Sequence, residues 1–348
     1  MTNNTIRVGY IGAGANTRKY HIPLMVKQPG VELVTVANRS KESSEKVAKE
    51  FGIPRISADW REVIADKNVD AICIGTWPYT HAEMTIAALE AGKHVLCEAR
   101  MAMSATEGRA MLAASRRHPK LVAQIVPSPF TLEVDPTLTK LVAERAVGDV
   151  LAVELYSSQA GRFGDQDAPM HWRQDRRFSG NNVLNMGIWY EAMMRWLGPL
   201  TRVMAVGKIV VPQRRGEDGI MRAIQVPDHV DIIGNFGVGP TARMRFSGFA
   251  AFAPSNEAWI FGTDGTIKLE ADAKRVLIGK RGDTALKEVE IPAAQRVGWR
   301  VEEEFINTIR GKEKTTRTNF EDGVRYMEFT DAVAKSMATG QAVDVKEL

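Results

Sequence analysis

The sequence predicts an α/β protein with two domains, and three observations support this. Over residues 1–126, short apolar runs alternate with helical patterns, which is typical of a parallel sheet covered by helices on both faces. The first apolar run ends in a Gly-x-Gly turn, which many doubly wound domains place after their first strand. Over residues 127–348, apolar runs mostly follow one another without helices between them. This pattern indicates an α+β domain with a large, mostly antiparallel open sheet.

Length and composition place the chain among ordinary globular proteins. Its 348 residues suit two domains, and 44% hydrophobic with 25% charged residues is enough to form two cores. The net charge of +4 is small, and the arginines form short groups rather than long runs, which argues against a nucleic-acid partner. A small ligand that is acidic or phosphorylated fits this charge balance better.

Cysteine usage and hydropathy predict a cytoplasmic protein with no membrane partner. Cys73 and Cys97 each lie near the end of an apolar run, where a buried, reduced thiol is the common state. No apolar run has the length of a bilayer span, and the first residues lack the basic and apolar regions of a signal peptide. The sequence shows no metal-ligand spacing, so no metal site is predicted.

Residues 6–40 have the outline of a βαβ unit that holds a dinucleotide. An apolar run at residues 6–11 meets Gly12 and Gly14, and a second apolar run follows about 20 residues later. Gly12 allows a sharp turn, and Gly14 leaves room for a pyrophosphate beside a helix N-terminus, whose free N–H groups favour an anion. Thr17 occupies the third glycine position, which loosens the motif and leaves a plain tight turn as the alternative.

The rest of the first domain supplies the sheet that such a unit requires. Ser40 and Gly52 mark the ends of one helix, and Ser104 with Glu107 forms a capping box for another. Pro23 should bend or shorten the first helix. Six short strands are expected, the last at residues 121–126, with helices at residues 15–28, 41–51, 59–69, 80–91 and 105–117.

Right-handed connections place the loops after the first, second, fourth and fifth strands at one edge of this sheet, where doubly wound folds bind ligands. These loops should line one crevice, and this context favours a dinucleotide site over a plain turn. We therefore expect a Rossmann domain at residues 1–126. The residues expected to bind the cofactor are Gly12, Gly14, Ala15, Asn16, Thr17, Asn38, Arg39, Ser40, Thr76, Trp77, His81, Glu98 and Arg100.

The end of the second strand favours NADP(H) over NAD(H) as the cofactor. An acidic residue there would hold the ribose 2′-hydroxyl, whereas an arginine suits a 2′-phosphate. The sequence has Asn38-Arg39-Ser40 and no acid at this place. The Arg39 guanidinium can form paired bonds to phosphate oxygens, and Ser40 can donate its hydroxyl or its backbone N–H. A solvent-exposed arginine without a ligand is the alternative, and NAD(H) stays open.

The second domain begins where the pattern changes, at the Pro-Ser-Pro sequence of residues 127–129. An open apolar face on its sheet would be a ready surface for a second copy, so we expect a homodimer or homotetramer. A helical insert is expected at residues 187–197, and helices at residues 301–310 and 320–338 close the chain. After a helix at residues 136–147, strands are expected at residues 150–159, 203–211, 230–236, 241–252, 258–261, 266–270 and 275–279.

Motifs in both domains resemble those of the glucose–fructose oxidoreductase / inositol dehydrogenase (Gfo/Idh/MocA) family. The longest is Ala87-Ala-Leu-Glu-Ala-Gly-Lys-His-Val-Leu-Cys-Glu98, and the glycine loop Val8-Gly-Tyr-Ile-Gly-Ala-Gly14 is another. The resemblance implies NAD(P)-dependent oxidation or reduction of a sugar or polyol, and dimers or tetramers packed through the open sheet. Further matching motifs are His21-Ile-Pro23, residues 76–81, Trp172-Arg173, Ser179-Gly180, Met186-Gly187, Trp196-Leu-Gly198, Gly262-Thr-Asp-Gly-Thr266 and Thr339-Gly-Gln-Ala-Val343.

The positions that carry catalysis in this family differ in the present chain. Members usually have Glu-Lys-Pro after the fifth strand, where the lysine orients the substrate hydroxyl; here the sequence is Glu-Ala-Arg, with Ala99 at the lysine position. In the family's Asp-x-Gly-x-x-x-His or Asp-x-Gly-x-His-x-x-Asp motif, Asn185 replaces the acid, and Trp189 or Tyr190 holds the histidine position. Ile125 stands where the family has an asparagine. The comparison implies a retained cofactor site without the usual acid/base set.

Four residues are candidates for the missing acid/base chemistry. Tyr190 could relay a proton if a cation lowered its pKa, and Arg100 could supply that charge or hold an anionic substrate. His171 lies in the loop that enters the substrate cleft in members of the family, and with Asp175 four residues later it could be a general base. The residues expected to contact the substrate are Trp172, Arg173, Asn185 and Trp189.

Each candidate also has a purely structural interpretation. Tyr190 and Trp189 at helical spacing could be core aromatics, and His171 could form hydrogen bonds within its loop only. Arg173 and Asp175 could form a structural ion pair. His81, at a position shared with the family, is expected to shape its loop rather than to do chemistry.

Hydride transfer to or from a sugar, polyol or related hydroxy or keto compound is the leading functional hypothesis, with NADP(H) as the cofactor. Two alternatives stay open. A tightly bound dinucleotide could be used transiently in a redox-neutral hydrolysis or elimination on a glycoside, as the resemblance to some branches of the family implies. A non-catalytic NADP(H) sensor could instead keep the nucleotide site without the chemistry.

Overall fold

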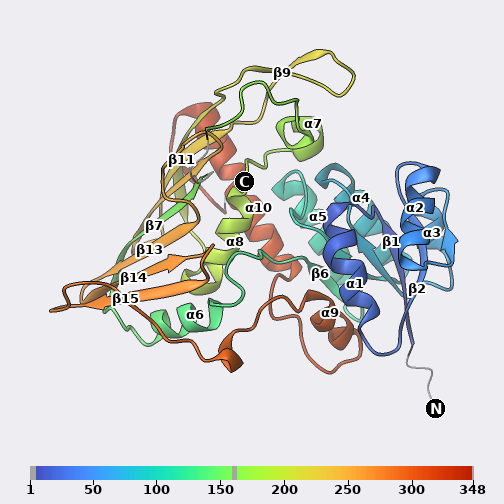
Figure 1. Cartoon of the computed structure of the whole chain (residues 1–348), viewed down its shortest axis with the longest axis horizontal. Helices are drawn as coiled ribbons and strands as arrows, with labels where there is room; N and C mark the ends of the chain where they lie inside the picture. The colour runs from blue at the N-terminus through green and yellow to red at the C-terminus, as the bar shows by residue number, and fades with distance from the viewer. Residues whose placement is uncertain (1–4, 159–162, 347–348) are drawn as a thin grey trace. The chain divides into compact units, whose positions relative to one another are not determined.

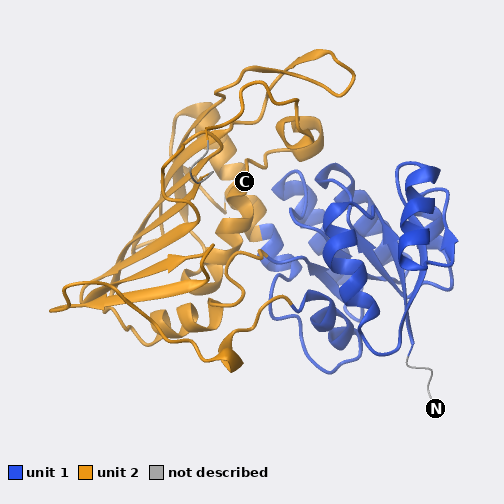
Figure 2. Ribbon diagram, in the orientation of Figure 1, with its two compact units in different colours: residues 1–127, 300–324 blue, residues 128–299, 325–348 orange. Residues whose placement is uncertain are grey.

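The computed structural model describes residues 5–158 and 163–346. The chain forms two compact units, which Figure 2 shows in different colours. Unit 1 consists of the chain up to residue 127 with residues 300–324, and unit 2 consists of residues 128–299 with the chain from residue 325.

The segment of residues 300–324 differs from the sequence prediction, which assigns all of residues 127–348 to the second domain. It contains α9 (Val301–Ile309), an amphipathic helix whose buried face includes Phe305. This face needs an apolar partner, and the helix contacts α1 (Ile22–Val26) of unit 1. Residues 300–324 therefore belong with the first unit.

Unit 1 holds a six-stranded parallel sheet in the order β3-β2-β1-β4-β5-β6, the strand order of a Rossmann fold. The predicted doubly wound sheet is thus confirmed. The central strands β1 and β4 are almost entirely buried, as expected for strands covered on both faces. The strands are β1 (Ile6–Ile11), β2 (Val31–Ala37), β3 (Arg55–Ile56), β4 (Ala71–Ile74), β5 (His94–Cys97) and β6 (Ala123–Ile125).

The helices of unit 1 begin at polar caps. Ser40, Asp59 and Ser104 each accept a backbone N–H from the first turn of the helix that follows. The first predicted helix consists of a short π-helix, η1 (Thr17–His21), and then α1, which carries Pro23 in its first turn. The others are α2 (Lys41–Phe51), α3 (Trp60–Ala65), α4 (Pro78–Glu90) and α5 (Ala105–Arg117).

Unit 2 contains a nine-stranded sheet in the order β16-β15-β14-β13-β7-β12-β11-β8-β17. Figure 1 labels its strands β7, β11, β13, β14 and β15. Its pairs are antiparallel except for β7 with β12, so the predicted mostly antiparallel sheet is confirmed. A separate hairpin joins β9 (Gln213–Arg215) to β10 (Met221–Ala223). The strands of the large sheet are β7 (Val150–Ser158), β8 (Arg202–Lys208), β11 (His229–Asn235), β12 (Thr241–Ser247), β13 (Glu257–Gly262), β14 (Gly265–Glu270), β15 (Arg275–Lys280), β16 (Lys287–Glu288) and β17 (Val343–Asp344).

The two faces of this sheet differ in burial. In β8, Val203 and Ala205 are buried, whereas Met204 and Val206 between them are exposed. Buried residues of α8 and α10 contribute to the core, and no helix in the described ranges has both the length and the hydropathy to cross a bilayer. The helices assigned to unit 2, wholly or in part, are α6 (Asp135–Ala143), η2 (Trp172–Gln174), α7 (Arg176–Ser179), α8 (Met186–Leu197), η3 (Ala293–Gln295) and α10 (Phe320–Thr339).

Candidate functional site

A pocket of about 410 Å³ opens in unit 1 beside the ends of β1, β2 and β4. Parallel strands end at the same edge of a sheet, so the loops after these strands meet there. The predicted cofactor residues that line the pocket are Gly12, Gly14, Asn38, Arg39, Thr76 and Trp77. Those that do not line it are Ala15, Asn16, Thr17, Ser40, His81, Glu98 and Arg100.

The two glycines of the loop differ in the space that surrounds them. Gly12 has a φ of +79°, and a Cβ there would lie 2.5 Å from Cγ2 of Thr76. Gly14 is different, because the nearest atom to an added Cβ is the carbonyl oxygen of Gly75 at 3.9 Å. The protein itself leaves the space beside Gly14 open. That open space fits the close approach of a phosphate group to the backbone.

Thr17 and Asn38 hold this loop in shape. Thr17 Oγ1 donates to the carbonyl oxygen of Gly12 at 3.3 Å, so the hydroxyl at the third glycine position closes the turn. Asn38 Oδ1 accepts the backbone N–H of Ala13 at 2.7 Å, and its own backbone N–H donates to Ser44 Oγ at 2.9 Å. Asn38 therefore ties the glycine loop to α2.

Arg39 is the cation of this pocket. Its side chain is exposed and lines the pocket together with Asn38 and Ser43. Ser40 has another role, because its Oγ accepts the backbone N–H of Ser43 at 3.3 Å and so caps α2. The arrangement leaves Arg39 as the residue that could bind a 2′-phosphate here.

An acid and two aromatic residues of the same pocket were not predicted from the sequence. Asp59 and Trp60 come from the loop after β3 and the start of α3, and Tyr79 comes from the first turn of α4. Asp59 Oδ1 caps α3 by accepting two backbone N–H groups, at 2.7 and 3.2 Å. Because β3 is only two residues long, no apolar run marks it in the sequence, and the loop that follows could not be assigned to the crevice.

The loop after β5 is held by a buried charge. His21 Nε2 lies 3.0 Å from Glu98 Oε1, and His21 Nδ1 lies 2.6 Å from Glu302 Oε1. Burial opposes the charged ring, but the hydrogen bonds to Glu302 and Glu98 prevail and raise the pKa of His21 to about 9. In Glu98, burial is in turn outweighed by the bond from His21, which lowers the pKa of that carboxyl. The Glu98 side chain is engaged in this internal contact, and its predicted contact with the cofactor stays a prediction.

His81 fastens the same loop from α4. Its Nδ1 lies 2.9 Å from the carbonyl oxygen of Arg100, and its Nε2 lies 3.1 Å from the carbonyl oxygen of Thr76. The ring is fully buried, and burial lowers its pKa. These contacts agree with the expectation that His81 shapes the loop.

In unit 2, the structure contradicts the acid/base role of Tyr190. Its side chain is fully buried, its ring stacks on Phe329 with centroids 3.8 Å apart, and its hydroxyl accepts the backbone N–H of Leu200 at 2.9 Å. Burial raises the pKa of Tyr190, which is the opposite of the activation that the hypothesis requires. Trp189 is also fully buried and stacks on Phe130, so it has no exposed surface for a substrate contact. Both residues are core aromatics.

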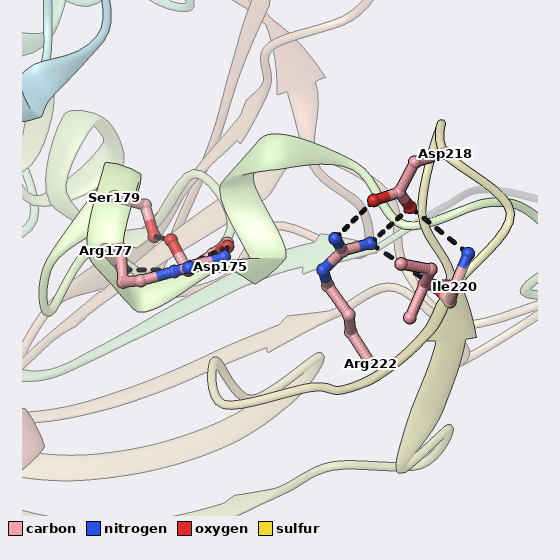
Figure 3. Close-up of polar contacts among 6 residues, drawn as sticks. All are labelled: Asp175, Arg177, Ser179, Asp218, Ile220 and Arg222. Atoms are coloured by element: carbon pink, nitrogen blue, oxygen red, sulfur yellow. Dashed lines mark hydrogen bonds and ion pairs between the residues drawn. The ribbon is translucent and has the colours of Figure 1, made fainter.

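Asp175 pairs with Arg177, two residues further along the chain (Figure 3). Its carboxylate accepts the backbone N–H of Arg177 at 2.9 Å and lies 2.6 Å from Nη2 of the same arginine. The Arg177 side chain holds the pKa of Asp175 below its usual range. The hypothesis that Asp175 assists His171 as a general base is therefore contradicted, because Asp175 caps α7 instead.

His171 lies at the surface, at the start of η2. Its Nδ1 accepts the backbone N–H of Arg173 at 3.3 Å, and its backbone N–H donates to Gln174 Oε1 at 3.0 Å. Partial burial and then the charge of Arg173 lower its pKa, so the ring is neutral at pH 7. The Arg173 guanidinium lies 4.3 Å from the ring centre of Trp172. This turn presents a neutral imidazole beside a cation.

Asn185, at the position of the family's acid, is part of a hydrogen-bonded chain. Its Nδ2 donates to Ser157 Oγ at 2.7 Å, and that hydroxyl donates to Asn256 Oδ1 at 2.7 Å. The chain ties the start of α8 to β7. The amide is therefore placed to fix the helix, and its predicted contact with a substrate stays a prediction.

Two family models match most of the chain. One, described as an oxidoreductase family with an NAD-binding Rossmann fold, matches residues 6–125, and the other, the GFO/IDH/MocA C-terminal domain, matches residues 137–268. With the strand order and the glycine loop, these matches define an NAD(P)-dependent oxidoreductase. The chain belongs to the GFO/IDH/MocA family.

Relatives and solved structures agree with this assignment. The 1,5-anhydro-D-fructose reductase of Ensifer adhaerens is 28% identical over 98% of both chains. The levoglucosan dehydrogenase of Pseudarthrobacter phenanthrenivorans is 28% identical over 69% of this chain and 67% of its own length. A solved levoglucosan dehydrogenase in complex with NADH and L-sorbose has a TM-score of 0.86 at 23% identity and covers 99% of both chains, which supports the fold.

Proposed function

We propose that the protein is an NADP(H)-dependent enzyme that moves a hydride to or from a hydroxyl-bearing carbon of a sugar or polyol. The observation that carries this proposal is the placement of the glycine loop and Arg39 in one pocket. Arg39 suits a 2′-phosphate, and the open space at Gly14 suits a pyrophosphate. Relatives named as a levoglucosan dehydrogenase and an anhydrofructose reductase support a small hydroxylated substrate.

Asp59 in the same pocket limits the preference for NADP(H). A carboxylate near the ribose repels a 2′-phosphate and suits a 2′-hydroxyl. The capping bonds from the N–H groups of α3 disperse part of that charge. We therefore propose a preference for NADP(H) with residual binding of NAD(H), rather than exclusive use of one cofactor.

We assign the proton transfer to His171. Oxidation of an alcohol to a carbonyl breaks one C–H bond and one O–H bond. The dinucleotide supplies the hydride acceptor when bound, and the hydroxyl proton needs a base. His171 is neutral at pH 7. With Nδ1 accepting the N–H of Arg173 at 3.3 Å, the ring proton lies on Nε2, so His171 acts as the base only in the other tautomer, in which this contact is broken. Trp172 and Arg173, on the same turn, are proposed to orient the substrate, and Arg173 would favour an anionic one.

The test uses the whole protein with NADP⁺ or NADPH and a panel of levoglucosan, 1,5-anhydro-D-fructose and inositol. We expect a stoichiometric change in NADPH absorbance with at least one of them. His171→Gln should lower kcat by about 10²–10⁴-fold, the range for a lost general acid or base. Product formation without any net change in NADPH would contradict net redox chemistry, and full kcat in His171→Gln would exclude His171.

The open face of the large sheet is proposed as the contact between copies of this chain. Met204, Val206 and Ile233 expose apolar side chains on β8 and β11. An exposed apolar face of this kind marks an interaction surface. Light scattering of the pure protein should give the mass of a dimer or tetramer, and a monomer at micromolar concentration would contradict this.

A further inference from the structure

The proposed chemistry does not use His21, although its surroundings are unusual for a histidine. Its side chain is fully buried, and each ring nitrogen faces a carboxylate oxygen, Glu98 Oε1 at 3.0 Å and Glu302 Oε1 at 2.6 Å. An ionised carboxylate can only accept hydrogen bonds, so both ring nitrogens must donate. His21 is therefore an imidazolium that bridges two glutamates.

The bridge joins three elements that are far apart in the sequence. His21 is the last residue of η1, which follows the glycine loop, and Glu98 follows β5. Glu302 lies in the first turn of α9 and is separated from His21 by 281 residues. One side chain thus links the glycine-loop helix, the loop after β5 and the returning segment of residues 300–324.

The contact continues into the backbone of the loop after β5. Glu98 Oε2 accepts the backbone N–H of Ala99 at 3.1 Å, while Oε1 faces His21. Both oxygens of Glu98 are therefore engaged, and the side chain has a defined orientation. Ala99 occupies the position at which the family usually has its lysine. The series of contacts from His21 through Glu98 therefore reaches the backbone at the position of that lysine.

His21 balances the charge of this cluster. Burial raises the pKa of Tyr10 and Cys73 and lowers that of His81, so these three neighbours of the glutamates are neutral at pH 7. Burial likewise raises the pKa of Cys97, the residue before Glu98. Without the imidazolium, two buried carboxylates would lose a cation that both of them contact, which is unfavourable.

We propose that His21 is a positioning residue of the cofactor unit: by bridging Glu98 and Glu302, it couples the glycine-loop helix to the loop of residues 98–100. Removing the bridge frees the Glu98 carboxylate and releases the N–H of Ala99, so the loop loses its fixed geometry at the edge of the sheet where the dinucleotide is proposed to bind. The inference rests on the proposed function for its probe, NADPH, and applies to any dinucleotide held by the glycine loop.

Linkage gives the bridge a pH window. The pKa of His21 is raised from 6.5 to about 9, so its contribution to stability is complete below about 6.5 and is lost as the pH rises through about 9. The pKa of Glu98 is lowered, so its contribution is present above the ordinary carboxyl value and is lost as the pH falls through its folded value. NADPH binding should therefore weaken as the pH rises through about 9.

The test measures the NADPH dissociation constant and the thermal midpoint of the whole protein over a pH series that crosses about 9. In the wild type, the dissociation constant should rise about tenfold across that pH. His21→Gln should bind NADPH about tenfold more weakly at neutral pH and show no step. Glu302→Gln keeps the contact between His21 and Glu98, so it should fold and move the step to lower pH. The matched control is His94→Gln, which removes a partly buried hydrogen bond from the backbone N–H of Val122 at the other end of β5 and should keep the wild-type step.

Four outcomes would overturn the inference. His21→Gln with a lower thermal midpoint but wild-type NADPH affinity at every pH would show a merely structural residue, and a step shared by wild type and His21→Gln would exclude His21 as its source. A wild type without the step would also contradict the bridge. If His21→Gln does not fold, an unshifted step in Glu302→Gln overturns it. Equal wild-type affinity for NADPH and NADH would instead contradict only the cofactor preference, so the two failures are distinguishable.

Discussion

The two units differ in where the residues singled out by the sequence lie: at a pocket in unit 1, and in the core or in an ion pair in unit 2. In unit 1, the glycines and Arg39 that the sequence singles out lie together at one pocket. In unit 2, Tyr190 and Trp189 lie in the core, and Asp175 pairs with Arg177. The proposed cofactor pocket therefore depends on backbone shape, which glycine spacing reveals, whereas the residues predicted to act on the substrate are of types that also serve packing and capping.

The largest effect is expected from a substitution in the glycine loop of unit 1. Gly12→Ala would place a Cβ 2.5 Å from Thr76 at a φ of +79°. Strain and overpacking together should lower the free energy of unfolding by about 3 kcal/mol or more. Chemical denaturation of the variant and the wild type measures this loss, and an unchanged midpoint would show that the loop is not rigid.

Gly14→Ala is the matched control for that substitution. The nearest neighbour of its Cβ is 3.9 Å away, so the free energy of unfolding should stay within about 0.5 kcal/mol of the wild type. The new methyl group should instead occupy space proposed for the pyrophosphate and weaken NADPH binding at least tenfold, or by about 1.4 kcal/mol. If Gly14→Ala destabilised the protein as much as Gly12→Ala does, Gly14 would be needed for the fold of the loop rather than to leave space for a ligand.

A smaller loss of stability is expected from a substitution of Tyr190, and it tests whether this residue belongs to the core. Tyr190→Phe keeps the stacking on Phe329 but leaves the backbone N–H of Leu200 without its acceptor. The free energy of unfolding should fall by about 1–3 kcal/mol, while kcat of the folded enzyme stays unchanged. A loss of kcat of a hundredfold or more in fully folded protein would restore Tyr190 to the chemistry.

The smallest effect concerns the cap of α7. Asp175 has a lowered pKa, so its contribution to stability is present above the ordinary carboxyl value and is lost as the pH falls through the folded value. Asp175→Asn keeps an acceptor for the cap but removes the ion pair with exposed Arg177, and should cost about 0.2–1 kcal/mol at pH 7. Thermal midpoints at neutral and acidic pH check this, and the difference between the two proteins should shrink in acid; a constant difference would contradict the ion pair.

Much of the fold could be predicted, because periodicity and caps are local signals. Ser40 and Ser104 mark helix starts in the sequence and cap α2 and α5 in the structure. The position of α9 could not be predicted, since an amphipathic pattern shows that one face is buried but not what covers it. The contact between His21 and Glu302 could not be predicted either, because the two residues are 281 positions apart in the sequence.

Of the pocket, the sequence predicts mainly the glycine loop, because the spacing of its glycines marks a turn. Asp59 reaches the pocket from a strand of two residues, too short to show a pattern. Trp189 and Tyr190 fall on a helix whose buried face would contain aromatic residues with or without a substrate. Sequence spacing places a side chain on a helix, but only packing shows whether that side chain faces a ligand or the core.

The proposed NADP(H) site around Arg39 is tested most directly by comparing two cofactors on two variants. Trp60 and Trp77 line the pocket, so quenching of tryptophan fluorescence can report binding of NADPH and NADH. Arg39→Asp should weaken NADPH at least tenfold and NADH by less than about threefold, while Arg117→Asp, with the same charge change at the end of α5 and outside the pocket lining, should affect neither. Equal losses for both cofactors in Arg39→Asp, or equal affinities in the wild type, would contradict the account.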